Sequence, residues 1–240
     1  MGAQYRFHNV LKWPAGALGL ATAVYASCIG RTWIRYGHPS PPSADATDPL
    51  LDRFMPVYDV AERHHVRVSA PADITFAAAC EADLMGSTVV RTIFKSRELI
   101  LGSAPGEERR LLGLVTLTKS LGWGVLAETP GREIVVGAVT QPWKADVAFR
   151  ALAPRDFATF GEPDFVKIVW TLRADPLSTT ASVFRTETRA MATDESARRA
   201  FRRYWSVFSP GIIVIRRMML GPVKAEAERR ARVAIRDYCR

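Results

Sequence analysis

The sequence has little cysteine, and the cysteines that it has form no pattern. Cys28, Cys80 and Cys239 lie far apart, with no CxxC pair and no Cys/His cluster at metal-ligand spacing. This spacing argues against a disulfide framework and gives no sign of a zinc site. An odd number of unpatterned thiols is typical of reduced cysteines packed as small apolar residues. We therefore expect the folded part of the chain to lie on the cytoplasmic side.

The short motifs of several enzyme classes are also missing. There is no GxSxG elbow, no HExxH pair, no phosphate-binding GxxxxGK[ST] loop and no GxGxxG turn that opens a helix. Gly122-Trp123-Gly124 leads into an expected strand, so it is not a dinucleotide turn. We therefore expect no cofactor and no bound metal, and the absences favour a binding protein over an enzyme.

What is present is an ordinary globular composition with an excess of basic residues. Hydrophobic residues make up 48% of the chain, which argues against wholesale disorder, and the net charge is +9. The sequence carries none of the usual nucleic-acid reader modules, so we expect no nucleic acid partner. The charge fits either a solvated Arg-rich surface or attraction to an anionic membrane, worth about 1 kcal/mol per basic residue near the surface.

The N-terminal region contains an uncharged stretch, residues 13–30, between Lys12 and Arg31. As a helix it would span about 27 Å, close to the thickness of a hydrocarbon core. The flanking aromatic residues are those that occur at membrane interfaces. We expect a retained single-pass anchor over residues 1–36. Two alternatives stay open, a signal peptide cleaved after residues 21–23 and a lipoprotein site at Cys28.

The segment after the anchor is rich in proline. Residues 37–56 contain five prolines among Ser, Ala and Asp, which predicts an extended tether that is not part of a core. Leu50, Leu51 and Phe54 are its candidates for docking back onto the domain. The folded domain is expected over residues 57–240.

Periodicity and turn signals predict the elements of this domain. Strands are expected at 64–68, 123–128, 133–140, 147–152, 165–173 and 182–192, and helices at 72–82, 88–101, 154–160 and 195–208. Residues 111–120 fit helix or strand. A loop should begin at Asp175-Pro176.

The last expected helix, residues 209–236, carries one apolar stripe. Ser209 is a candidate N-cap, Pro210 suits the first helical position, and Pro222 should kink the helix. The stripe recurs at three- and four-residue steps at Ile212, Ile215, Met219, Pro222 and Val223. Such a helix needs a broad apolar surface, and the preceding strands can supply it.

In this order of elements the chain resembles the START-like helix-grip superfamily, which includes polyketide cyclases and dehydrases and lipid-transfer domains. The resemblance covers residues 58–232 and rests on the opening strand that runs into a helix through Ala70-Pro71, and on the closing strand and terminal helix. It implies an α+β fold in which a curved antiparallel sheet wraps a long C-terminal helix and encloses an apolar cavity for lipids, sterols or polyketides.

Several residues are candidates for contact with an apolar ligand in such a cavity. Tryptophan offers a large apolar area with one N–H donor, and threonine offers the few polar contacts that orient a ligand. The candidates are Trp123, Trp143, Trp170, Thr186, Thr188, Ile215 and Met219.

Glu187 is the one candidate for catalysis. Paired with Glu133 in a cavity, it would form two carboxylates able to do acid–base work. Strand alternation places Arg185 and Arg189 on the same face as Glu187, so structural salt bridges are the better interpretation.

The adjacent histidines His64 and His65 point to opposite faces of a strand, so they cannot share a metal.

The sequence therefore predicts a membrane-anchored domain, not an enzyme, that binds a hydrophobic small molecule or lipid, with residues 13–30 in the membrane. One alternative is an enzyme of the cyclase or dehydrase type that uses Glu187 or a histidine. The other is an Arg-rich interaction module at a membrane surface.

Overall fold

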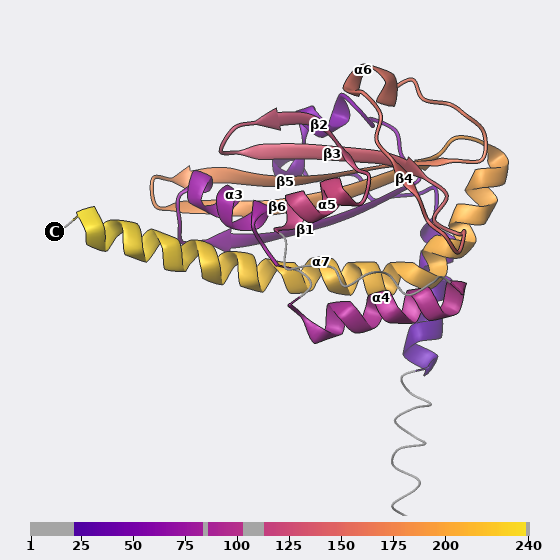
Figure 1. The fold of residues 1–240 in the computed structure, drawn as a ribbon, viewed down its shortest axis with the longest axis horizontal. Coiled ribbons are helices and arrows are strands. Elements are labelled where there is room, and N and C mark those ends of the chain that lie inside the picture. Colours follow the sequence, from indigo (N-terminus) through magenta and orange to yellow (C-terminus); the bar gives the residue numbers. More distant parts are fainter. Residues whose placement is uncertain (1–21, 84–85, 103–112, 239–240) are drawn as a thin grey trace, which may run out of the picture.

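The computed structural model of the protein describes residues 22–83, 86–102 and 113–238. It confirms the α+β class: a curved, six-stranded antiparallel sheet lies against a long C-terminal helix (Figure 1). Residues 22–35 are also helical. The other elements are η1 (Ala44–Ala46), α2 (Pro49–Asp52), β1 (Val60–Val68), α3 (Ala72–Cys80), α4 (Thr88–Leu101), α5 (Leu114–Ser120), β2 (Gly124–Thr129), β3 (Glu133–Thr140), β4 (Phe149–Arg150), α6 (Pro154–Phe157), β5 (Val166–Ser178), β6 (Ala181–Ala192) and α7 (Glu195–Tyr238).

The strands follow the order β1-β6-β5-β3-β2, and β4 pairs with β3. The long β5–β6 hairpin forms the centre, and β1 is an edge strand. The expected loop at Asp175-Pro176 is wrong, since both residues remain in β5. The side chain of Asp175 accepts from Arg173 and Arg185, and Pro176 lies at a register shift, where a strand tolerates proline.

Alternation along the strands gives the sheet two different faces. On β6, Phe184 and Thr186 point to the side of α3 and α7, which we call the inner face. Glu187 and Arg189 point to the opposite side, the outer face, which is covered by residues 48–58.

Among the described residues, three groups of buried apolar side chains hold the layers together. On the inner face, the C-terminal half of α7 packs through Met219, Val223, Ala227 and Ala231 against α3, β3, β5 and β6; this is the first cluster. The N-terminal part of α7 packs against β1 and β5 in a second inner cluster that includes Phe201 and Trp205. The outer face has a cluster of its own.

The outer cluster corrects the expectation of a tether for residues 48–56 and confirms that Leu50, Leu51 and Phe54 dock onto the domain. Leu51, Phe54 and Met55 are buried against the outer face, so residues 48–56 belong to the core and do not form a free tether. Pro49 begins the short helix α2, and the side chain of Asp48 caps it by accepting from the backbone N–H of Leu51 at 2.8 Å.

The two C-terminal helices expected from the sequence are one helix, α7. Ser209 lies inside it, fully buried, and is not an N-cap. Figure 1 shows α7 descending past one end of the sheet and bending into its long run, and the bend lies in the N-terminal half, which contains Pro210. A proline inside a helix removes a hydrogen bond and accounts for such a bend.

Other boundaries differ less. α4 and β3 have the expected bounds, β1 begins four residues earlier than expected, and the open segment 111–120 contains the helix α5. The expected strand at 147–152 is reduced to β4, and the expected turn at 154–160 to α6.

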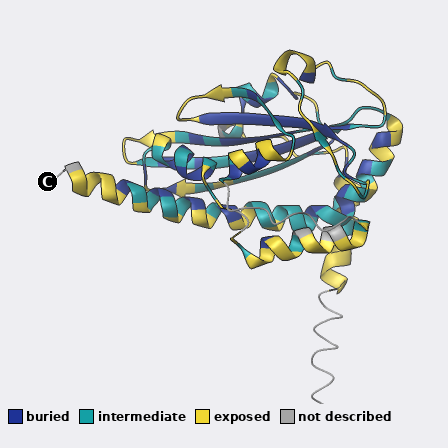
Figure 2. Cartoon of the chain, in the orientation of Figure 1, coloured by how far each residue is buried: buried dark blue, intermediate teal, exposed yellow. Residues whose placement is uncertain are grey.

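Most of the expected anchor, residues 1–21, lies outside the described residues. Residues 22–35 form a helix with an exposed surface (Figure 2). In the described part of the chain, one helix, α7, is long and apolar enough to cross a membrane by length and composition, and 22% of its most apolar window is buried. Its packing against the sheet identifies it as the long helix of the fold.

Candidate functional site

The predicted ligand-contacting residues gather on the inner face. Trp170 on β5, Thr186 and Thr188 on β6, and Met219 on α7 are all buried there. Trp170 lies directly opposite Thr188 in the β5–β6 register. Ile215 on α7 is half-buried.

The three predicted tryptophans do not form one group. Trp123 and Trp170 meet edge to face with ring centroids 6.5 Å apart, and Trp123 also packs on Phe149. Trp143 belongs instead to the second inner cluster, with Ile168 and Ile212.

The residue that the sequence analysis missed is Arg216 on α7. Its guanidinium carbon lies 5.0 Å from the centroid of the Trp170 ring, a cation–π contact. Its Nη1 donates to Oγ1 of Thr186 at the long distance of 3.4 Å. Arg216 forms no ion pair within the described part of the chain, and burial lowers the pKa of its guanidinium to about 10.

A signal for Arg216 exists in the sequence. The spacing Ile212, Arg216, Met219, Val223 is as regular as the stripe first traced through Ile215, so a charged residue interrupts the apolar stripe at helical spacing. A charge on the buried side of a helix needs a partner or a function.

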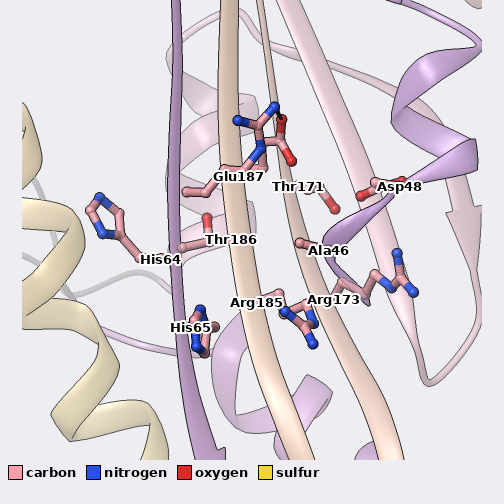
Figure 3. A pocket seen from close by; sticks show the side chains of 10 residues that line it. Ala46, Asp48, His64, His65, Thr171, Arg173, Arg185, Thr186 and Glu187 are labelled. Carbon is pink, nitrogen blue, oxygen red and sulfur yellow. Dashed lines mark ion pairs between the residues drawn. The ribbon is translucent and has the colours of Figure 1, made fainter. Parts of the chain in front are cut away.

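His64 lies beside Thr186. The two residues are direct partners in the β1–β6 register, so their side chains share the inner face. Figure 3 shows His64 pointing toward α7 and away from the side chains of the outer face, such as Glu187 and Arg185. The side chain of His64 is 9% exposed, and its Nε2 atom has no hydrogen-bond partner among the described residues. Burial, and then the charges of Arg217 and Arg216, lower the pKa of His64 to about 4.

Glu62 is the acid on this part of the inner face. It pairs with Thr188 in the register, and its Oε2 lies 4.0 Å from Nε2 of His64, beyond hydrogen-bond distance. Burial raises the pKa of Glu62, and Arg217 and Arg35 act against that rise.

The polar side chains therefore form a defined group, which we call the inner polar group: Arg216, His64, Thr186 and Thr188. Along α7 it lies between the second inner cluster, which ends at Ile212, and the first, which begins at Met219. A cation, an unpartnered imidazole nitrogen and two hydroxyls are thus flanked on both sides by apolar surface. Such convergent polar groups in an apolar setting are typical of ligand sites.

Glu187, the candidate for catalysis, lies on the outer face. Its carboxylate is buried and accepts from Arg189 at 2.7 Å and from Arg63 at 2.8 Å. The salt-bridge interpretation holds for Arg189, whereas Arg185 pairs with Asp175. Glu187 is therefore on the opposite side of the sheet from the inner polar group.

A small cleft opens on the outer face beside Glu187 (Figure 3). Its walls include Ala46, Asp48, His65, Arg173 and Arg185, and the volume that the centre of a water molecule can occupy is about 30 Å³. This is room for water and not for a lipid or polyketide.

Glu133 is also on the outer face, separate from Glu187. Its Oε1 accepts from the hydroxyl of Thr171 at 3.3 Å. Burial, and then the nearby carboxyl group of Asp48, raise the pKa of Glu133 to about 8. The acid that faces Glu133 among the described residues is therefore Asp48, whereas Glu187 binds Arg63 and Arg189, so the alternative of a Glu133 and Glu187 pair gains no support.

Comparison with known proteins finds no matching family model and no matching curated protein. Among solved structures, a hypothetical protein from Helicobacter pylori aligns over 78% of this chain and 99% of its own, with a TM-score of 0.39 and 6% identity. A protein from Chromobacterium violaceum aligns over 70% and 97%, with a TM-score of 0.27 and 12% identity. The Zhui aromatase/cyclase from a Streptomyces species aligns over 72% and 96%, with a TM-score of 0.24 and 16% identity.

The architecture of the chain resembles that of the START-like helix-grip superfamily. A strand leads into helices, antiparallel strands follow, and a long C-terminal helix packs on the inner face of the sheet.

Proposed function

We propose that the protein is anchored in a membrane and binds a hydrophobic small molecule or lipid between the inner face of its sheet and α7, without catalysing a reaction. The observation that carries the proposal is an exposed apolar surface on two helices that both contact α7. The inner polar group marks where the ligand would be oriented.

The apolar surface consists of large side chains that a soluble protein would bury. On α4, Leu99 is 85% exposed and Ile100 is 64% exposed, and on the helix of residues 22–35 Ile34 is 74% exposed. Val24, Tyr25 and Trp33 on the helix of residues 22–35 and Val89 on α4 are also exposed, and α7 itself adds the exposed Val214 and Met218. Figure 2 shows both helices largely exposed. Exposed apolar residues gathered in this way mark a contact surface.

The two helices meet α7 within about one turn of each other. The hydroxyl of Tyr25 donates to the carbonyl oxygen of Val207 at 2.5 Å, and Ile93 of α4 lies 3.0 Å from the position of a Cβ on Gly211. Arg91 and Lys95 of α4 are exposed. An amphipathic helix with apolar and basic residues is suited to the surface of an anionic bilayer. Residues 22–30 would form the C-terminal half of the expected membrane span, and α4 would lie on the membrane.

Anchoring would favour ligand capture, because it holds the binding layer near a source of hydrophobic molecules and so raises their effective concentration. The enzyme alternative loses one of its two kinds of acid–base candidate, since Glu187 is held by two arginines on the other side of the sheet, and only a histidine is left to it.

The membrane contact can be tested by hydrogen–deuterium exchange on the full chain in lipid nanodiscs. We expect slow exchange across α4 in nanodiscs that contain anionic lipid, and faster exchange in the double variant Leu99→Ser/Ile100→Ser. Leu177→Ser is the matched control, since Leu177 is 48% exposed on the β5–β6 hairpin. Two results together would refute the proposed membrane contact: carbonate extracts the full chain from membranes, and hydrogen exchange across α4 is equal in all variants.

The ligand part is tested by native mass spectrometry of the full chain released from non-ionic detergent, with organic extraction of what co-purifies. A bound hydrophobic molecule is the expected result. Protein that is free of any such molecule, and that takes up none when single-chain amphiphiles are added, would refute it.

A further inference from the structure

We infer that the inner polar group binds an acidic head group, a carboxylate or a phosphate, carried by an apolar molecule. This inference rests on the proposed function and names the chemical class of its ligand. It is carried by a cation that has no counter-ion among the described residues, next to an imidazole nitrogen that has no hydrogen-bond partner there, between two apolar clusters of the inner face.

Arg216 is the main anchor for the acidic group. Two arginines of the sheet with little exposed surface are paired: Arg189 binds Glu187 and Asp52, and Arg173 binds Asp175. Arg216 has only the ring of Trp170 and a long hydrogen bond to Thr186 within the described residues. Removing a guanidinium from water costs free energy that a counter-ion normally offsets. An acidic ligand would supply that counter-ion and accept a charge-assisted hydrogen bond.

His64 and the two threonines provide further contacts. The Nε2 atom of His64 is buried and makes no hydrogen bond among the described residues, which is uncommon for a buried polar atom. Thr186 lies between His64, its register partner, and Arg216, its hydrogen-bond partner. A head group bound to Arg216 would therefore reach the imidazole and the hydroxyl from one position.

The surroundings fit an apolar tail. Met219 of α7 and Trp170 of β5 belong to the apolar cluster on one side of the inner polar group. Ile212 of α7 and Ile168 of β5 belong to the cluster on the other side. Arg216 is half-buried, so the site is not sealed from solvent. Glu62 would repel an anion, but Arg217 and Arg35 act on its carboxyl group as opposing charges.

The test measures binding of three probes to the full chain in non-ionic detergent by native mass spectrometry. The probes are oleic acid, oleoyl lysophosphatidic acid and oleyl alcohol, which differ mainly in the head group. We expect at least one acid to bind about tenfold more tightly than the alcohol, and the tighter acid identifies the head group as carboxylate or phosphate. Arg216→Met should remove this preference and leave binding of the alcohol unchanged, whereas Arg216→Lys should keep part of it.

Arg203→Met is the matched control, because Arg203 is exposed on α7 and its removal changes the net charge equally. It should bind all three probes as the wild type does. The melting temperature of Arg216→Met without ligand should be equal to or above that of the wild type, since the variant removes an uncompensated charge. A lower melting temperature with unchanged acid preference would show that Arg216 is structural and would overturn the inference.

The outcomes separate this inference from the proposed function. If oleyl alcohol binds as tightly as both acids, the head-group assignment is wrong and hydrophobic binding stands. If none of the three binds and no lipid co-purifies, both are wrong.

Discussion

Glu187 and Arg189 lie two residues apart on β6 and bind each other on the outer face of the sheet, with 2.7 Å between Oε1 and Nε. The same guanidinium donates from Nη1 to Asp52 at 2.5 Å and to the carbonyl oxygen of Met55 at 2.7 Å. It also lies 4.7 Å from the centroid of the Tyr58 ring. Arg189 therefore fastens residues 52–58 to the sheet.

Arg189→Ala should destabilise the protein by about 3–5 kcal/mol, because it leaves Glu187 with less compensation in a buried setting. Chemical unfolding of the full chain in one mild detergent measures this. The exposed Arg199→Ala should change the free energy of unfolding by less than about 0.5 kcal/mol. If both variants unfold alike, the outer network does not stabilise the fold.

A second prediction concerns Glu133 and pH. Its pKa in the folded state, about 8, is above the ordinary value, so folding favours the protonated form. Between about pH 4.5 and 8 the unfolded chain has lost this proton and the folded chain keeps it, so stability must fall as pH rises. Below about pH 4.5 Glu133 is protonated in both states, and its contribution to the free energy of unfolding is fully present.

Glu133→Gln should remove this loss, because the amide carries no titratable proton and still accepts from Thr171. We expect the variant to be more stable than the wild type at pH 9 by about 1–3 kcal/mol and similar to it at pH 5. Unfolding measured at pH 5, 7 and 9 tests this, with the exposed Glu195→Gln as control. Parallel pH curves for Glu133→Gln and the wild type would contradict it.

Much of the sheet could be predicted from the sequence because the information is local. The alternation of β6 places Thr186 and Thr188 on one face and Glu187 on the other, as the structure has it. The start of α3 after Pro71 and the turn before β3 could likewise be predicted, because each depends on only a few neighbouring residues.

The rest depends on pairings between distant residues. The contact between Arg63 and Glu187 exists because β1 pairs with β6 across more than a hundred residues. The burial of Leu51 depends on an outer face that becomes apolar only when β3 and β5 lie together. The sequence alone cannot show that Arg216 lacks an ion pair among the described residues, because this depends on where the acidic residues around α7 lie in the fold.

A third prediction uses two glycines of α7. Gly221 is exposed inside the helix, and apart from its neighbours along the chain a Cβ there would meet nothing within 4 Å. Pro222 follows it, and the proline ring crowds a Cβ on the preceding residue in the α conformation. Gly221→Ala should therefore gain less than the about 0.5–1 kcal/mol that helix propensity alone would give. Gly211→Ala should be less stable than Gly221→Ala, because its Cβ would lie 3.0 Å from Ile93 of α4. Thermal unfolding compares the two variants, and equal melting temperatures would mean that α4 does not pack on α7 as described.

The last prediction concerns Asp59, which joins three parts of the chain just before β1. Its buried carboxylate accepts from the backbone N–H of Ala192 at 2.9 Å and from the hydroxyl of Tyr36 at 3.4 Å, and it forms an ion pair with Arg198 of α7. The C-terminal end of the expected anchor, Tyr36, is thereby tied to the sheet and to the start of α7.

Asp59→Asn should cost about 1–3 kcal/mol, because the amide oxygen keeps one acceptor role while the charge that binds Arg198 is lost. Hydrogen exchange should quicken in residues 32–37 and in the first turns of α7, and stay unchanged in the β5–β6 hairpin. Arg198→Met should give a smaller effect of the same kind, since Arg198 is 49% exposed. Exchange that quickens equally over the whole chain would show that Asp59 supports global stability and does not link the anchor side to the domain.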